Sequence, residues 1–485
     1  MKVKQIIDTV PLLKEVLQSA MGVKYKLLAT VMADRIQKGE IEAGTKLPPH
    51  RILADALGVT IGTVSRVYGE LERLGLVVAR VGDGTFVRQR GLESKREAGF
   101  RNALDQPEPY YDMSRNLHIP GQESTYLAQS LRELANDPQI LQEISLYAPE
   151  AGLVRHRQAG ARWLTQNDFI ASPEQVICVN GAQHGLMCAL IGLLRPGDTL
   201  VTEQLTYPGL ITAARLLGIR LLGIQMDDEG LLPESLDELC CINRVSALYC
   251  TPTIQNPTNA VMSVERRKAI VQVCRTHNLL ILEDEAHGVL ASDRPPPLGV
   301  YAPERTVFIG SFSKAVAAGL RVGYLHAPAP LVNRLATAVR TTCWMATPIA
   351  FELASRWIDQ GIAKDLLQQQ VVEIIQRKKL VTGLLAGLHF QSHPESPHFW
   401  IEVPAPWRAV EIEAELQQKN YLISTSEAFA VGRQVVVQFV RASVSNTWGN
   451  DEMLCDGFGK LAGLLNRDSN RFVEPHANKH VVRST

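Results

Sequence analysis

The sequence predicts an α/β protein in which helices wrap a mostly parallel sheet, preceded by a smaller helical domain. From about residue 112 to residue 465, short apolar runs alternate with helical patterns, which is typical of parallel sheets. Residues 24–88 show helical periodicity followed by a hairpin signal. With 485 residues and 46% hydrophobic composition, the chain can bury the cores of two or three domains.

The amino-terminal domain is predicted element by element within residues 24–88. Two helical stretches are followed by a third apolar face at i, i+3, i+4, i+7 and i+10, formed by Val64, Val67, Tyr68, Leu71 and Leu74. Thr60 is the expected N-cap of this helix and Gly75 its expected stop. Two strands, at 76–80 and 85–88, are joined by a Gly-Asp-Gly turn. Helix, helix, turn, helix and hairpin is the layout of a winged helix-turn-helix.

The rest of the chain divides by composition. Residues 89–111 are polar and aperiodic, and we interpret them as a flexible linker. Residues 112–465 form the second domain, and the polar tail 466–485 is expected to be disordered. The four clearest strands, in chain order, are 176–179, 245–249, 279–282 and 306–309, and an apolar helix is expected at 186–194.

Charge and cysteine usage narrow the class of protein. Lysine plus arginine equals aspartate plus glutamate at 50 each, but residues 24–101 hold 14 basic and 9 acidic residues. We therefore expect any polyanionic partner to bind to the amino-terminal domain. The eight cysteines form no CxxC pair, which indicates a reduced cytoplasmic protein with neither disulfides nor a metal site. No signal peptide and no run of eighteen apolar residues is present, so no membrane partner is expected.

Ligands of open parallel sheets bind beyond the carboxyl ends of the strands, so the residues there are the candidate site. After the fourth predicted strand come Ser311, Ser313, Lys314 and, seven residues on, Arg321. A lysine amine can form a Schiff base with an aldehyde, while hydroxyls and an arginine hold phosphate oxygens. This stretch therefore suits a phosphorylated aldehyde.

The other three strand ends carry groups that suit the same ligand. Gly181 follows the first strand and opens a helix, where backbone N–H groups bind phosphate. Asn256 follows the second strand and suits a phenolic oxygen. Asp284 follows the third strand, and its carboxylate suits a protonated pyridine nitrogen. The alternative is that these acidic residues cap helices and that the glycine makes an ordinary turn.

Residues 112–465 resemble the fold-type I aminotransferases, whose cofactor is pyridoxal 5'-phosphate, and the motifs occur in the same order. The resemblance implies a large sheet domain with a smaller carboxy-terminal α+β subdomain. It implies that Lys314 is the Schiff-base lysine, that Asp284 faces the pyridine nitrogen, and that Arg441 clamps a substrate carboxylate. It also implies that Asn256 contacts the ring hydroxyl and that Tyr207 stacks on the ring. Tyr147 would reach the phosphate across a dimer interface. The remaining implied phosphate contacts are Gly181, Ala182, Ser311, Ser313 and Arg321.

The chain departs from that family at one informative place. The family commonly has a tyrosine two or three residues after the aspartate to bond the ring hydroxyl, and here those residues are Ala286 and His287. The His287 imidazole could donate a similar bond. The alternative is a histidine bonded to backbone at a helix start.

Residues 24–88 resemble the GntR-type winged helix through their whole length, from Gly-Thr-Lys-Leu-Pro-Pro-His-Arg to the wing Gly-Asp-Gly-Thr-Phe-Val. The resemblance implies that the amino-terminal part of the second motif helix enters the major groove of double-stranded DNA. The matched DNA contacts are Lys46, Arg51, Thr60, Thr63, Ser65, Arg66, and the wing residues Gly82 and Gly84. The alternatives are a solvated basic face or a winged domain that binds only protein.

A GntR-type head joined to an aminotransferase-like domain resembles the MocR-type regulators. This resemblance implies a homodimeric transcription factor whose large domain senses an amine, an amino acid or the cofactor itself. A working aminotransferase with an appended head is the competing interpretation, since Lys314, Asp284, Asn256 and Arg441 are all present. A protein-interaction scaffold with an enzyme-like fold is the third.

Overall fold

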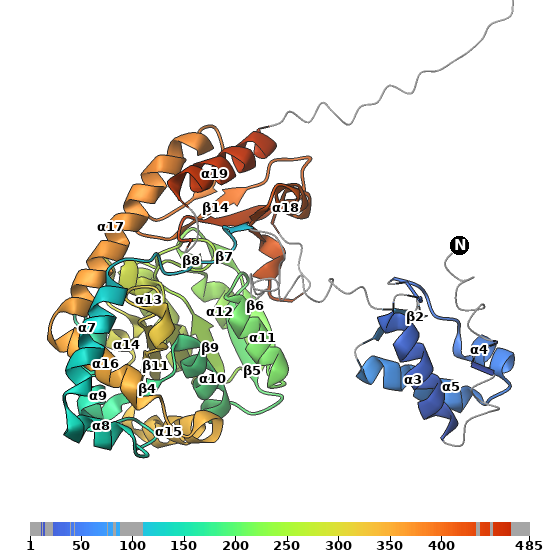
Figure 1. Cartoon of the computed structure of the whole chain (residues 1–485), viewed down its shortest axis with the longest axis horizontal. Coiled ribbons are helices and arrows are strands. Elements are labelled where there is room, and N and C mark those ends of the chain that lie inside the picture. The colour runs from blue at the N-terminus through green and yellow to red at the C-terminus, as the bar shows by residue number, and fades with distance from the viewer. Residues whose placement is uncertain are drawn as a thin grey trace, which may run out of the picture. The chain divides into compact units, whose positions relative to one another are not determined.

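The structure is a computed structural model that describes residues 11, 13–14, 23–38, 40–42, 44–74, 76–80, 84–87, 110–432, 437–446 and 450–466. The chain divides into two compact units, Met1–Ala98 and Gly99–Thr485, which Figure 1 shows with their elements labelled. Gly75, Gly82, most of the predicted linker and the tail from residue 467 lie outside the described residues. The domain boundaries in those stretches therefore stay predictions.

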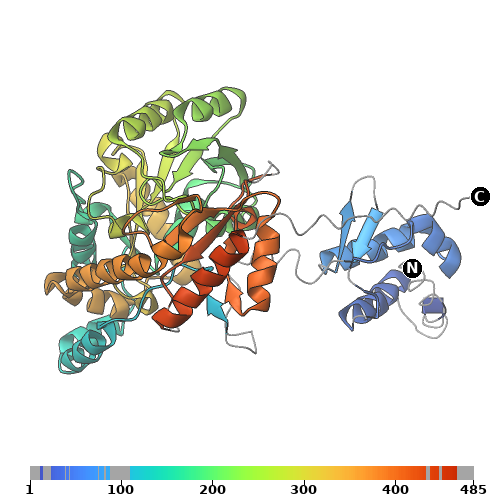
Figure 2. The ribbon, with the colours of Figure 1, turned by 90° about the horizontal axis from the view of Figure 1, so that it is seen from above.

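The described part of the first unit has the predicted order of elements. It runs through α3 (Lys24–Gln37), α4 (His50–Leu57), α5 (Ile61–Arg73), β1 (Val77–Arg80) and β2 (Gly84–Val87). The two strands pair antiparallel, and Figure 2 shows them beside the helices of the same unit. The winged helix-turn-helix layout is thus confirmed.

Local chemistry explains the ends of these helices. The Thr60 hydroxyl oxygen accepts the backbone N–H of Thr63 at 3.2 Å, so Thr60 is the N-cap of α5 as predicted. Gly58 ends α4 in the left-handed conformation, with φ 67°. Leu28 of α3 and Leu71 of α5 are buried in one hydrophobic cluster, which holds the helices together.

A seven-stranded sheet forms the centre of the second unit, in the order β4-β12-β11-β10-β9-β5-β6. Four of its six neighbouring pairs are parallel, and β12 runs antiparallel to both of its neighbours. The mostly parallel sheet is therefore confirmed. The strands are β4 (Val176–Val179), β5 (Thr199–Glu203), β6 (Arg220–Ile224), β9 (Ala247–Cys250), β10 (Leu280–Asp284), β11 (Thr306–Ser311) and β12 (Gly323–His326).

Helices cover both faces of this sheet, because successive side chains of a strand point to opposite faces. Val179 and Ile309 belong to one core, and Cys178 and Phe308 belong to another. The helices that contribute to the first core are α10 (Ala182–Leu193), α11 (Pro208–Leu216) and α15 (Ala329–Cys343). On the opposite face lie α9 (Val154–Leu164), α12 (Pro233–Ile242), α13 (Val264–Thr276), α14 (Leu298–Tyr301) and α16 (Pro348–Asp359).

A smaller four-stranded sheet, in the order β13-β14-β17-β16, lies at the end of the unit where α17, α18 and α19 gather (Figure 1). Its elements are β13 (Phe390–Gln391), β14 (His398–Glu402), β16 (Ser424–Thr425), β17 (Phe439–Ser443), α17 (Ile362–Thr382), α18 (Ala409–Gln418) and α19 (Asp451–Leu465). The short pairs β3 (Tyr111–Asp112) with β15 (Tyr421–Leu422) and β7 (Met226–Asp227) with β8 (Gly230–Leu231), and the helices α7 (Glu123–Ala135) and α8 (Pro138–Ile144), complete the unit.

Several predicted boundaries were wrong by a few residues. The strand predicted at 245–249 begins two residues later, and Asp284 is the last residue of its strand because it pairs with Ile309 of β11. The helix predicted at 186–194 already begins at Ala182, directly after a left-handed turn at Gly181, φ 82°. Asp284 therefore ends its strand rather than following it, and the first turn of α10 begins directly after Gly181.

We expect Gly323→Ala to destabilise the second unit. A β-carbon at Gly323 would lie 2.8 Å from the carbonyl carbon of Gly181 and 3.0 Å from the nitrogen of Ala182, both of them backbone atoms. Overpacking of this kind costs about 1–3 kcal/mol. Thermal unfolding of the variant should therefore begin several degrees lower.

Gly319→Ala is the matched control, because a β-carbon there meets no atom within 4 Å. Equal melting temperatures for the two variants would contradict the close approach of β12 to the start of α10.

Candidate functional site

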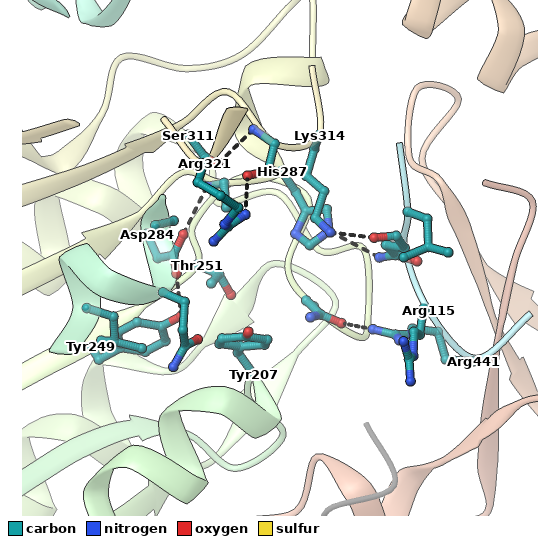
Figure 3. A pocket seen from close by; sticks show the side chains of 18 residues that line it. Arg115, Tyr207, Tyr249, Thr251, Asp284, His287, Ser311, Lys314, Arg321 and Arg441 are labelled. Atoms are coloured by element: carbon teal, nitrogen blue, oxygen red, sulfur yellow. Dashed lines mark hydrogen bonds between the residues drawn. The ribbon is translucent and has the colours of Figure 1, made fainter. Parts of the chain in front are cut away.

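A cavity of about 320 Å³ lies at the carboxyl ends of β9, β10 and β11 (Figure 3). Sequence-predicted residues from separate parts of the chain share its wall, namely Ala182, Tyr207, Asn256, Asp284, His287, Ser311, Ser313, Lys314, Arg321 and Arg441. Arg441 comes from β17 of the small sheet, so both sheets of the second unit contribute. With Arg115, which also lines the cavity, the arrangement brings one amine, one carboxylate and three guanidinium groups together.

One end of the cavity is built to hold an anion. Arg321 donates to the Ser313 hydroxyl at 3.1 Å, and the Ser313 N–H donates to the Ser311 hydroxyl at 3.0 Å. The N–H groups of the first turn of α10 lack acceptors within the helix and lie at the positive end of its dipole. A β-carbon at Gly181 would lie 2.5 Å from Arg321 Nη2, so a side chain there would push this guanidinium aside.

Lys314 lines the middle of the cavity, and its amine donates a hydrogen bond to the backbone oxygen of Asn116. Burial, together with the positive charges of Arg441 and Arg321, lowers the pKa of Lys314 to about 8, and Asp284 opposes this shift. The amine therefore loses its proton more easily than an exposed lysine. A neutral amine is the form that attacks a carbonyl carbon.

Asp284 is held in place at the end of β10. Its carboxylate accepts the Tyr249 hydroxyl at 2.8 Å and the Ala286 N–H at 2.9 Å. Burial raises the pKa of Asp284, while these two hydrogen bonds and the charge of Lys314 oppose the rise. A buried carboxylate supported in this way suits a cationic N–H group of a ligand.

The Arg441 guanidinium lies on the small-sheet side of the cavity. It donates to the Asn256 side-chain oxygen at 2.6 Å and to the Ser114 backbone oxygen, and it lies over the Phe429 ring. Among the described residues its Nε–H has no acceptor and no carboxylate lies within salt-bridge distance. Burial lowers the pKa of Arg441 to about 10. The charge of Asp112 opposes this shift from beyond salt-bridge distance, so the guanidinium can still bind an anionic ligand.

His287 makes a side-chain contact rather than the backbone contact offered as the alternative. Its Nε2 lies 3.1 Å from the Asn116 side-chain nitrogen, and its ring makes no capping bond. Burial lowers the pKa of His287 to about 3, so the imidazole is neutral. Whether it takes the place of the usual tyrosine stays a prediction.

Tyr207 and Tyr147, both predicted to contact the cofactor, lie in different places. Tyr207 lines the cavity, and burial raises the pKa of its hydroxyl to about 12. Tyr147 does not line the cavity: it is 80% exposed, with its ring 5.5 Å from that of Trp344. A role for Tyr147 therefore depends on a second copy of the chain and stays a prediction.

Sequence reasoning missed part of the cavity wall. Arg115 and Asn116 come from the stretch after β3, where no strand-end motif marks them. Tyr249 lies inside a strand, and its bond to Asp284 connects two neighbouring strands. Strand alternation could have found Tyr249, since it belongs to the same face as the apolar residues that pack on α10. Nothing in residue spacing indicates Asn116.

The predicted DNA contacts of the first unit gather around α5. Thr60, Thr63, Ser65 and Arg66 lie at its start, and Arg51 lies in α4. Arg51, Ser65 and Arg66 are exposed, whereas the Thr60 oxygen caps the helix. Lys46 forms an isolated bridge with Phe86, and its side chain lies close beside Gly84. Gly82 lies outside the described residues.

Three residues outside the cavity lie close enough together to hold a metal ion. The fold brings Asp237, Cys241 and His277 within 4.8 Å of one another, although no cysteine–histidine spacing in the sequence indicates a metal site. The His277 ring already bonds the Asp237 carboxylate at 2.6 Å, and none of the three lines the cavity. Over the described ranges, every helix is too short or too polar to cross a bilayer.

Comparisons with known proteins cover both units. Residues 118–458 match the aminotransferase class I and II family, and residues 24–87 match the bacterial regulatory proteins of the gntR family. The chain is similar to the uncharacterized HTH-type transcriptional regulator YdeF of Bacillus subtilis, at 28% identity over 87% of this chain and 90% of that protein. It is also similar to the HTH-type transcriptional regulator TauR of Rhodobacter capsulatus, at 27% identity over 90% of this chain and 96% of that one.

Among solved structures, the fold is similar to that of an archaeal alanine:glyoxylate aminotransferase. The TM-score is 0.70 at 20% identity, over 77% of this chain and 95% of that one. The chain therefore belongs to the aminotransferase class I and II family, and its GntR-family head joined to an aminotransferase-like domain is the organisation of the MocR-type transcriptional regulators.

Proposed function

We propose that the protein is a DNA-binding transcriptional regulator whose second unit binds pyridoxal 5'-phosphate and senses an amine-bearing effector. The observation that carries this proposal is the lowered pKa of Lys314 inside a cavity that also holds an anion-binding end and a buried carboxylate. An amine, a phosphate cradle and a carboxylate are the three groups that this cofactor requires. The competing interpretations, a working aminotransferase and a protein-binding scaffold, are distinguished by the experiments below.

The residues present fit the cofactor. Ser311, Ser313, Arg321 and the start of α10 at Gly181 and Ala182 would hold the phosphate, and Lys314 would meet the aldehyde. Asp284 would face the ring nitrogen, Asn256 and His287 would contact the ring hydroxyl, and Tyr207 would pack on the ring. When bound, pyridoxal phosphate supplies an electron-accepting ring. The chain supplies orientation: Tyr249 and Ala286 fix the Asp284 carboxylate, and Arg321 is fixed by Ser313.

We further propose that the effector carries a carboxylate. Arg441 is buried, has a free Nε–H among the described residues, and uses its other donors on neutral oxygens. A guanidinium binds a carboxylate with two parallel hydrogen bonds, which is stronger than its present contacts. An amino acid supplies that carboxylate together with the amine, so it fits this site better than a simple amine.

The assembly is proposed to be a homodimer that binds double-stranded DNA through the first unit. Tyr147 is 80% and Trp344 55% exposed, and the two rings contact each other on the surface. Exposed aromatic pairs of this kind are typical of surfaces that another chain covers. The basic surplus of the head and the exposed Arg51 and Arg66 support a polyanionic partner.

Adding pyridoxal phosphate to the purified protein should give a visible absorption band that Lys314→Ala abolishes. The rate at which the band appears should fall about tenfold per pH unit below pH 8 and level off above it, since the neutral amine is the reacting form. Stopped-flow absorbance measures this profile. A colourless wild-type protein would favour the scaffold interpretation, and rapid amino-group transfer without DNA binding would favour the enzyme.

Replacing Arg51 and Arg66 together with alanine should weaken binding to duplex DNA from the region flanking the protein's own gene. Loss of two phosphate contacts should lower the slope of log Kd against log salt by about two. Fluorescence anisotropy at several salt concentrations measures the slope. Arg35→Ala/Lys38→Ala is the matched control, because it removes equal charge from residues already paired with Glu40 and Asp34. Equal slopes for both double variants would count against the assigned face.

Arg441→Lys should erase discrimination between amino acids and the amines that remain when the carboxylate is removed. Losing one charged two-point contact costs about 1.5–3 kcal/mol, or about 10- to 100-fold in relative affinity. Spectral titration of the cofactor-loaded protein with L-alanine and ethylamine measures the ratio. Arg377→Lys is the control, since that arginine binds Glu373 in the same subdomain. An unchanged ratio in Arg441→Lys would mean that the effector carboxylate binds elsewhere or is absent.

A further inference from the structure

Residues 111–117, here called the junction segment, are where the chain arriving from the DNA-binding head joins the second unit. Only residues 88–109 separate β2 of the head from the described residues that resume at Tyr110. The junction segment begins with β3, which pairs parallel with β15. Any displacement of this segment therefore acts on the start of the covalent connection to the head.

One side of the junction segment is bound to the small carboxy-terminal subdomain. The Met113 N–H donates to the Leu422 oxygen at 2.9 Å, and the Leu117 N–H donates to the Ser445 oxygen at 3.1 Å. In return the Ser443 N–H donates to the Met113 oxygen at 2.8 Å. These three bonds are all between backbone groups, so they attach the segment to the small subdomain independently of its side chains.

The other side of the junction segment forms part of the cavity wall, as Asn116 and Arg115 line it. Lys314 donates to the backbone oxygen of Asn116, and Arg441 donates to the backbone oxygen of Ser114. Ser114 and Asn116 are 7% and 6% exposed, so water does not readily replace either donor. The two cations assigned to ligand binding are thus the donors that hold this backbone.

The Asn116 side chain ties the segment to histidines from both sheets. His398 Nε2 lies 2.9 Å from the Pro257 oxygen and must donate to it, which leaves His398 Nδ1 to accept from the Asn116 amide at 2.9 Å. The second amide hydrogen points to His287 Nε2 at 3.1 Å. Burial keeps the pKa of both histidines low, so both rings are neutral acceptors. The amide is therefore a clamp between the two sheets.

We propose that the junction segment is the relay by which ligand binding in the cavity reaches the DNA-binding head. This inference rests on the proposed function, because it requires a ligand that engages Lys314 and Arg441. In the free protein the two side chains hold the backbone oxygens of Asn116 and Ser114. A bound aldehyde takes away the donor of the Asn116 oxygen, and a bound carboxylate draws away the donor of the Ser114 oxygen, so each ligand leaves the segment more dependent on its bonds to the small subdomain.

The chemistry of each exchange balances. When the neutral Lys314 amine condenses with an aldehyde, a carbon–nitrogen double bond forms and the carbonyl oxygen leaves as water with both amine hydrogens. No hydrogen then remains for the Asn116 oxygen. A carboxylate that takes the Nε–H and one Nη–H of Arg441 draws the guanidinium away from Ser114, whose oxygen keeps the Ser424 hydroxyl at 2.9 Å. Asn116 thus loses its donor, and the buried backbone must shift or admit water.

Hydrogen exchange of the full-length protein tests the relay directly. On adding pyridoxal phosphate alone, amide exchange in a peptide covering 111–117 should become faster, on the order of threefold to tenfold. A peptide from α13, which contributes no residue to the cavity wall, is the internal reference and should not change. Unchanged exchange at 111–117 in protein that has developed the visible band would overturn the relay. Absence of the band would instead contradict the proposed function.

The second measurement is the ratio of DNA affinities with and without saturating pyridoxal phosphate. Asn116→Ala removes the clamp to His287 and His398, so the segment is loosened in both states and the ratio should fall toward one. Asn136→Ala is the matched control, because that exposed amide bonds only its own helix, at the Arg132 oxygen. A wild-type ratio in Asn116→Ala would overturn the relay, whereas a ratio of one in the wild-type protein would contradict ligand sensing itself.

Discussion

The second unit depends on holding several positive charges around one cavity without enough negative charge to balance them. Lys314, Arg321 and Arg441 share one cavity, and Asp284 is the carboxylate among its lining residues. Among the described residues, neither guanidinium makes a salt bridge, and the lysine responds by giving up its proton more readily. Such a cavity gains most from a ligand with anionic groups at two ends. The excess of cationic donors around the cavity thus supports both the proposed place of the ligand and its proposed charges.

Close packing of backbone at the edge of the sheet makes this charge arrangement possible. Arg321 lies against Gly181, where any β-carbon would overlap its guanidinium, and Gly323 of β12 lies against the same turn. The Tyr207 ring likewise lies where a β-carbon on Gly209 would be, 2.3 Å from its Cε1 atom. Three glycines therefore let two strands, a helix start and an aromatic ring converge on one anion-binding end.

How much the sequence predicts depends on whether a residue acts through its side chain at a strand end. Lys314 and Asn256 follow apolar strands and Asp284 ends one, so parallel-sheet geometry alone brought them to one edge. The helix cap at Thr60 could also be predicted, because a capping oxygen accepts a hydrogen bond from the backbone only three residues away. Strand ends shifted by up to two residues, since ladder pairing rather than hydropathy decides where a strand stops. Gly82 and the linker remain beyond the described residues, and the sequence prediction for them stands untested.

Every residue type has a backbone oxygen, so a contact made by that oxygen cannot be predicted from the sequence. The role of the junction segment could not be predicted for this reason. Ser114 and Asn116 accept from Arg441 and Lys314 through carbonyl groups that any residue would offer. Such a contact is suitable for coupling ligand binding to the head, because it is lost whenever a ligand occupies the donor, whatever the ligand is. Covalent continuity is then the route by which the proposed change reaches the head. A regulator built in this way must keep the reactive lysine of its enzymatic relatives, since the amine that meets the ligand is also the group that holds the connection to DNA.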